Sequence, residues 1–190
     1  MSQVVVVIAN GSEEIETCCA FDLLKRAGAK VSIAKAPSSP EDVGNLNIEL
    51  SHGFKTIADM SIDDAAKQDW DMIVLPGGLP GTEHVAKSSV TIEMLKKQKA
   101  AGKWIGAICA APAFILAANG LLDGEKATSY PSLQDKLPDK SQAKDPVVVS
   151  NKIITSQSPG TAFKFGLELV KALVGEAKME ELRKSTYSMV

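Results

Sequence analysis

The residue with the clearest chemical potential lies in the stretch WIGAICAAPAFILAANG, where a predicted strand turns into a predicted helix. An apolar run ends at Cys109, and Pro112 opens an alanine-rich helical pattern. Free N–H groups at a helix start stabilise a thiolate, and such sites lower a thiol pKa from about 8.5 to about 3.5–7.5. A sharp turn there exposes a nucleophile, and the N–H of Ala110 then faces an oxyanion on a substrate carbonyl. Cys109 is therefore a candidate nucleophile; the alternative is an inert cysteine in an apolar core.

Two other segments offer groups that would complete such a site. Gly77 and Gly78 follow an apolar strand, and they can bring a second backbone N–H close to Cys109 because glycine has no obstructing side chain. Glu16 lies in the first turn of a helix predicted to begin near Ser12. Its carboxyl can point across the sheet edge towards Cys109 and carry protons, or it can simply complement the helix dipole.

The histidines offer little support for a cysteine–histidine pair. A nucleophilic cysteine usually works with a histidine base. This chain has two histidines, His52 in a predicted hairpin turn and His84 after the glycine pair, and neither follows Cys109. We expect both to be surface residues, which also weakens a peptidase interpretation.

Composition and motifs exclude several other classes of function. The net charge is −2 and lysines are spread along the chain, so no nucleic-acid footprint stands out. No apolar stretch approaches the ~20 residues of a membrane span, and no basic residue precedes the first apolar run as in a signal peptide. No phosphate loop, cofactor motif or metal-ligand spacing is present. Three cysteines, two of them adjacent, favour a reducing, cytoplasmic setting.

Strands alternate with helices along the chain, which predicts a single α/β domain over residues 1–190. The ligand-binding edge of such a mostly parallel sheet lies at the carboxyl ends of its strands. Apolar runs predict strands, and 3.6-residue patterns predict helices. The expected strands are Val4–Ala9, Lys30–Ala36, Asp71–Leu75 and Trp104–Cys109, with hairpins at Asn47–Ile57 and Val147–Ser156. The expected helices are Ser12–Ala27, Ser89–Ala101, Pro112–Ala118, Thr161–Val174 and Glu176–Lys184.

Four motifs then carry a family resemblance over Val4 to about Val174. The segments GSEEIET, IVLPGG, AICAAP and ITSQSPGTAF, in this order and spacing, resemble the DJ-1/PfpI family of the class I glutamine-amidotransferase-like superfamily, and its DJ-1 branch in particular. The resemblance implies a flavodoxin-like three-layer α/β/α sandwich that forms a homodimer. It implies a reactive Cys109 whose sulfur is hydrogen-bonded by a protonated Glu16. It also implies oxyanion N–H groups from the site residues Gly77, Gly78 and Ala110, and a dimer interface near Arg26 and Cys19.

The resemblance implies a cofactor-free activity on small reactive aldehydes. The first hypothesis is a glutathione-independent glyoxalase or protein deglycase that acts on methylglyoxal, glyoxal and their early amine adducts. The second is an oxidative-stress sensor or redox-regulated chaperone that works through oxidation of Cys109 to sulfinic acid. Three positions depart from the family pattern: Tyr130 replaces a histidine near the site, His52 an arginine and Ser158 a glycine.

Overall fold

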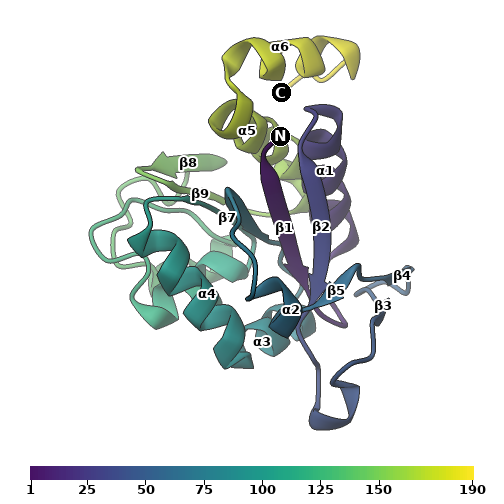
Figure 1. The fold of residues 1–190 in the computed structure, drawn as a ribbon. Helices are drawn as coiled ribbons and strands as arrows, with labels where there is room; N and C mark the ends of the chain where they lie inside the picture. The colour runs from purple at the N-terminus through teal and green to yellow at the C-terminus, as the bar shows by residue number, and fades with distance from the viewer.

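A central seven-stranded sheet organises the protein, whose computed structural model describes residues 1–190 (Figure 1). The strand order is β5-β2-β1-β6-β7-β9-β8, and every neighbouring pair is parallel except β8 and β9. The strands are β1 (Gln3–Ile8), β2 (Lys30–Lys35), β5 (Met60–Ser61), β6 (Met72–Leu75), β7 (Trp104–Ile108), β8 (Val147–Ser150) and β9 (Ile153–Ser156). The mostly parallel sheet predicted from the sequence is confirmed.

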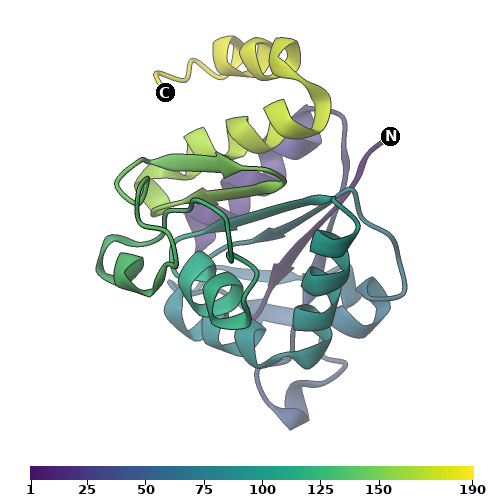
Figure 2. The ribbon, with the colours of Figure 1, turned by 90° about the vertical axis from the view of Figure 1, so that its left-hand side faces the viewer.

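Helices cover both faces of this sheet, which confirms the flavodoxin-like three-layer sandwich (Figures 1 and 2). One face carries α1 (Glu14–Arg26) and α5 (Ala162–Val174), and α6 (Glu176–Ser185) packs on α5. The other face carries α2 (Ile62–Ala65), α3 (Leu79–Lys87) and α4 (Ser89–Ala100). None of these helices combines the length and the apolar character that crossing a membrane requires.

The alternation of side chains along β1 creates the two cores. Val5 and Val7 pack into a cluster of 25 buried residues on the α2–α4 side. Val4 and Val6 pack into a cluster of 22 buried residues with α1 and α5. Because successive side chains of a strand point to opposite faces, a continuous valine run serves both layers at once.

A separate two-stranded hairpin extends from the sandwich beside the start of α1 (Figure 1). It pairs β3 (Asn47–Glu49) with β4 (Lys55–Ile57) in antiparallel register, as the sequence predicted. The Ser51 N–H donates to the Ser12 carbonyl at 2.9 Å, and the Gly11 N–H donates to the Glu49 carbonyl at 2.9 Å. The turn of this hairpin is therefore held against the loop that leads into α1.

Three helical segments differ from the expectation: α2 and α3, where no helix was predicted, and the segment after Cys109. The sequence analysis predicted no helix at α3; its Pro80 stands in the first turn, where no N–H is needed. The segment after Cys109 is wound as a π-helix over Pro112–Leu116, and a 3₁₀ turn follows over Ala117–Asn119. A regular α-helix was predicted here, but the segment forms a short π-helix, a structure that is frequent at functional sites.

Candidate active site

Cys109 occupies a strained turn at the carboxyl end of β7. Its φ of 65° is in the left-handed region, which few residues other than glycine adopt. Its N–H donates to the Ser156 carbonyl at 3.0 Å, and its carbonyl accepts from the Tyr130 N–H at 2.8 Å. The flanking chain therefore holds the turn in place, and the partly exposed thiol stands at the sheet edge as the sequence predicted.

Glu16 reaches the same place from the first turn of α1. The residue is 0% exposed, and its Oε2 accepts a hydrogen bond from the Gly77 N–H at 2.7 Å. Its carboxyl lies within hydrogen-bonding reach of the Cys109 thiol. The Oε1 atom is buried and has no hydrogen-bond partner. The structure thus directs Glu16 inwards, and a solvent-facing acid that only complements the dipole is excluded.

The third segment of the site is the glycine pair after β6, which lies against both Cys109 and Glu16. A Cβ on Gly77 would lie 2.5 Å from the Cys109 Cβ and 2.8 Å from Glu16 Oε2. Gly78 has a φ of +88°, and its N–H and that of Ala110 lie close enough to the Cys109 sulfur to lower the pKa of the thiol. Of the expected oxyanion donors, Gly78 and Ala110 face the sulfur, whereas the Gly77 N–H is committed to Glu16.

The electrostatics of the pair correct the expectation of a low thiol pKa. Burial, and then the charge of Glu16, raise the pKa of the Cys109 thiol to about 12, although the N–H groups of Gly78 and Ala110 oppose this. Burial raises the pKa of Glu16 to about 7, and the charge of Glu13 adds to the effect. The two side chains lie close together, and this place in the protein holds one negative charge far more easily than two. The local sequence suggested a helix dipole that lowers the thiol pKa, but burial and, after it, a carboxyl from another element raise this pKa instead.

The remaining candidate near the sulfur is Tyr130. Its backbone N–H holds the Cys109 carbonyl, and the residue is 43% exposed. His52 is exposed as predicted, whereas His84 is half-buried with Nδ1 3.1 Å from the Asn10 carbonyl. The hydrogen bonds of His52 are to Ser51 and Glu14, and that of His84 is to Asn10.

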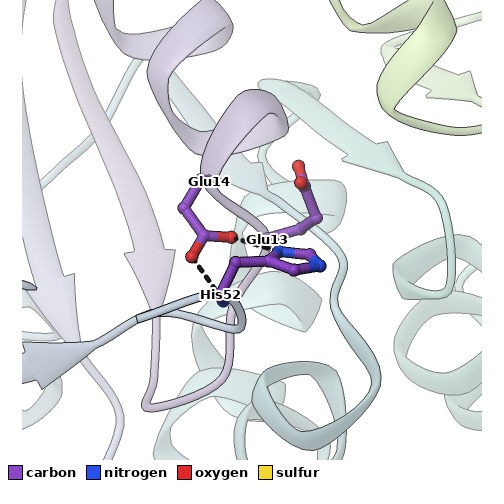
Figure 3. A group of neighbouring side chains, drawn as sticks. All are labelled: Glu13, Glu14 and His52. Atoms are coloured by element: carbon purple, nitrogen blue, oxygen red, sulfur yellow. Dashed lines mark hydrogen bonds and ion pairs between the residues drawn. The ribbon is translucent and has the colours of Figure 1, made fainter. Parts of the chain in front are cut away.

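The fold also assembles a cluster that the sequence spacing did not reveal. Side-chain atoms of Glu13, Glu14 and His52 lie within 4.8 Å of one another (Figure 3). Glu14 Oε2 lies 2.9 Å from His52 Nδ1 and accepts from the Ser51 hydroxyl at 2.8 Å. Burial alone would raise the pKa of Glu14, but the hydrogen bonds from His52 and Ser51 lower it to about 2. Spacing along the sequence could not reveal this group, because the hairpin brings His52 to Glu14 from 38 residues away.

The residues expected at a dimer interface lie on the outer part of α1. Arg26 is exposed and pairs with Asp22 at 2.6 Å. Cys18 is exposed, and Cys19 is half-buried against the core shared with α5. The interface itself stays a prediction.

Comparison with known proteins decides the family. The model of the DJ-1/PfpI family matches residues 2–172, most of the chain. The chain belongs to this family. Protein DJ-1 homolog A of Arabidopsis thaliana is 44% identical over 97% of this chain, but the match covers 45% of that protein. The chain therefore spans less than half the length of that relative.

Two further relatives cover nearly all of both chains. A Caenorhabditis elegans protein named "Glutathione-independent glyoxalase DJR-1.2" is 34% identical over 96% of this chain and 94% of its own. The solved structure of Toxoplasma gondii DJ-1 in oxidized form superposes with a TM-score of 0.93 at 37% identity, and all of both chains is covered. These likenesses support the family and the fold along the whole described chain.

Proposed function

We propose that this protein is a cysteine-dependent, glutathione-independent glyoxalase that also acts on early adducts of methylglyoxal or glyoxal with amines. The observation that carries the proposal is the buried pairing of the Cys109 thiol with the Glu16 carboxyl beside the N–H groups of Gly78 and Ala110. The name of the C. elegans relative supports the same class of reaction.

In the first step, the Cys109 thiol passes its proton to the Glu16 carboxylate. The sulfur then bonds to the aldehyde carbon of methylglyoxal, and the π electrons of that carbonyl move onto its oxygen. The N–H groups of Gly78 and Ala110 stabilise this alkoxide, which takes the proton back from Glu16. The product is a neutral thiohemiacetal on Cys109.

In the second step, Glu16 removes the proton from the former aldehyde carbon and returns a proton to the neighbouring ketone carbon. The hydroxyl proton moves from the first oxygen to the second, so the adduct becomes a lactoyl thioester with the same atoms. Water then breaks the thioester, which releases lactate and restores the thiol; glyoxal gives glycolate in the same way. A carboxyl with a pKa of about 7 suits both directions of proton transfer near neutral pH.

The test is lactate formation from methylglyoxal by purified protein without glutathione. The wild type should convert methylglyoxal, and Cys109→Ser should fall to the uncatalysed rate with its fold intact. Cys18→Ser is the matched control, because this thiol is exposed on α1. If turnover survives in Cys109→Ser, or is lost in Cys18→Ser, then Cys109 is not the nucleophile.

One observation favours a second function, redox sensing. Glu16 Oε1 is buried without a partner, and the carboxyl lies within reach of the Cys109 sulfur, so that a protonated Glu16 could donate to an oxidised sulfur. Two peroxide molecules would each transfer one oxygen to Cys109, giving a sulfinic acid and two waters. Mass spectrometry after peroxide treatment should show this species in the wild type and less of it in Glu16→Gln. Equal amounts in both proteins would exclude the role of Glu16.

The assembly that we expect is a homodimer formed through α1. Ile15 on α1 is 52% exposed and Phe54 after the hairpin turn is 57% exposed, so apolar surface is available there. Sedimentation should give twice the 20.1 kDa mass of the chain. A monomer at all working concentrations would contradict this expectation.

A further inference from the structure

Glu13 is a buried residue that the proposed reaction does not use. It is 7% exposed and is the N-cap of α1, where its Oε2 accepts from the Glu16 N–H at 2.8 Å. Its own N–H donates to the Gly77 carbonyl at 3.0 Å, and the Gly77 N–H in turn donates to Glu16 Oε2 at 2.7 Å. Glu13, Glu16 and Gly77 therefore form a closed ring of hydrogen bonds beside the thiol.

A glutamate is an unusual choice for this position. Ser, Thr, Asp and Asn are the preferred N-caps, and a neutral serine would satisfy the Glu16 N–H as well. What a glutamate adds is a negative charge, which the positive end of the α1 dipole favours. That charge lies next to a second buried carboxyl, and it therefore opposes ionisation of Glu16.

The charge of Glu13 acts on Glu16 from one side and on His52, whose pKa it helps to raise, from the other. Glu13 takes part in no ion pair of its own, and His52 is hydrogen-bonded to Glu14 on the solvent side (Figure 3). The other titratable groups near Glu13 are the thiols of Cys18 and Cys19 on α1, while Cys109 faces Glu16 from the β7 turn. Burial is the larger cause of the raised pKa of Glu16, and the charge of Glu13 acts in the same direction.

We infer that Glu13 is a positioning residue of the site: as the N-cap of α1, its carboxylate fixes Glu16 against the Gly77 loop and places a second negative charge beside the Glu16 carboxyl. The part played in turnover rests on the proposed glyoxalase function. The effect on Glu16 is a property of the folded protein and is measurable without any substrate.

The test is a carbon NMR titration of the Glu16 carboxyl, assigned by its disappearance in Glu16→Gln. Glu13→Gln keeps the shape and the hydrogen-bond acceptor but removes the charge, so the Glu16 midpoint should move from about 7 towards the ordinary value of 4.5. Glu13→Asp keeps the charge and the cap, and should stay close to the wild type. Glu14→Gln removes an equal charge from the adjacent residue and is the matched control, which should leave the midpoint in place.

A second neutral variant guards against misfolding. If Glu13→Gln does not fold, Glu13→Ser supplies a preferred N-cap without charge and should show the same downward shift. An unchanged Glu16 midpoint in a folded neutral variant, or an equal shift in Glu14→Gln, would overturn the inference.

Turnover separates this inference from the proposed function. The rise of kcat/KM with pH should have its midpoint near 7 in the wild type and at lower pH in Glu13→Gln. If the wild type leaves methylglyoxal unchanged, the proposed function is wrong, but the NMR titration of Glu16 still tests the role of Glu13. If the wild type turns over methylglyoxal but the Glu16 midpoint is the same in Glu13→Gln, only the inference about Glu13 is wrong.

Discussion

Gly77→Ala tests how tightly the site is built, since Gly77 lies between its two reactive side chains. An alanine Cβ there would lie 2.5 Å from the Cys109 Cβ, 2.8 Å from Glu16 Oε2 and 3.0 Å from the Cys109 sulfur. Carbon atoms in good contact are about 3.5–4.0 Å apart, so the groups must separate by about 1 Å. The φ of Gly77 is not in the left-handed region, and the effect is therefore purely steric.

The size of the effect follows from this displacement. Overpacking of this kind costs about 1–3 kcal/mol, and each kcal/mol lowers Tm by about 2–4 °C in a chain of this length. The protein should therefore fold with a reduced Tm. A displacement of about 1 Å at reacting groups reduces turnover by about 10²-fold, which methylglyoxal consumption would measure.

Gly160→Ala is the matched control, because the nearest atom to its new Cβ is Ser158 Oγ at 3.9 Å. It should leave both Tm and turnover unchanged. A folded Gly77→Ala variant with wild-type activity would refute the tight packing of Cys109 and Glu16 around Gly77 as a requirement of the reaction.

The remaining predictions concern Glu16 and the pH dependence of the pair. Glu16→Gln should slow turnover by about 10²–10⁴-fold; aldehyde should still add to Cys109, but more slowly, because water must then take the thiol proton in place of Glu16, and unchanged turnover would make Glu16 a merely structural residue. Burial raises the pKa of Glu16 from 4.5 to about 7, so the wild type loses stability as pH rises from 4.5 to 7, by roughly 3 kcal/mol. Urea unfolding should therefore show Glu16→Gln to be the more stable protein at pH 8 but not at pH 4; parallel curves would contradict the buried charge. Alkylation of Cys109 by iodoacetamide should rise with pH through about 7, where the pair first carries a negative charge, and a rise that begins only near 9 would show that Glu16 takes no proton from the thiol.

The fold was readable from the sequence because its strands are buried on both faces. The valine run of β1 and the apolar runs of β6 and β7 have no polar alternation, as expected for a parallel sheet between two helical layers. The meeting of Cys109 with Glu16 followed from the same pattern, since both lie beyond the carboxyl ends of parallel strands. The α3 helix was missed because Pro80 and Gly81 are breakers in most contexts, but here they stand in the first turn against the Gly11–Ser12 loop.

The electrostatics of the site were not readable in the same way. The raised pKa of Cys109 depends on burial and on a carboxyl 93 positions earlier in the chain, and local sequence reports only the helix that follows. The Glu14–His52 pair likewise depends on where the hairpin docks. Both the pKa shift of Cys109 and the Glu14–His52 pair arise from tertiary contacts, which the spacing of residues within one segment cannot predict.

Rapid-quench mass spectrometry of the peptide that contains Cys109 tests the nucleophile most directly. Wild-type protein mixed with methylglyoxal should carry, at Cys109 and before steady state, an adduct with the mass of one methylglyoxal. The adduct should disappear as lactate forms, and in Glu16→Gln it should accumulate and persist. Lactate production with Cys109 unmodified at every time point, or an adduct confined to Cys18 or Cys19, would contradict covalent catalysis at Cys109.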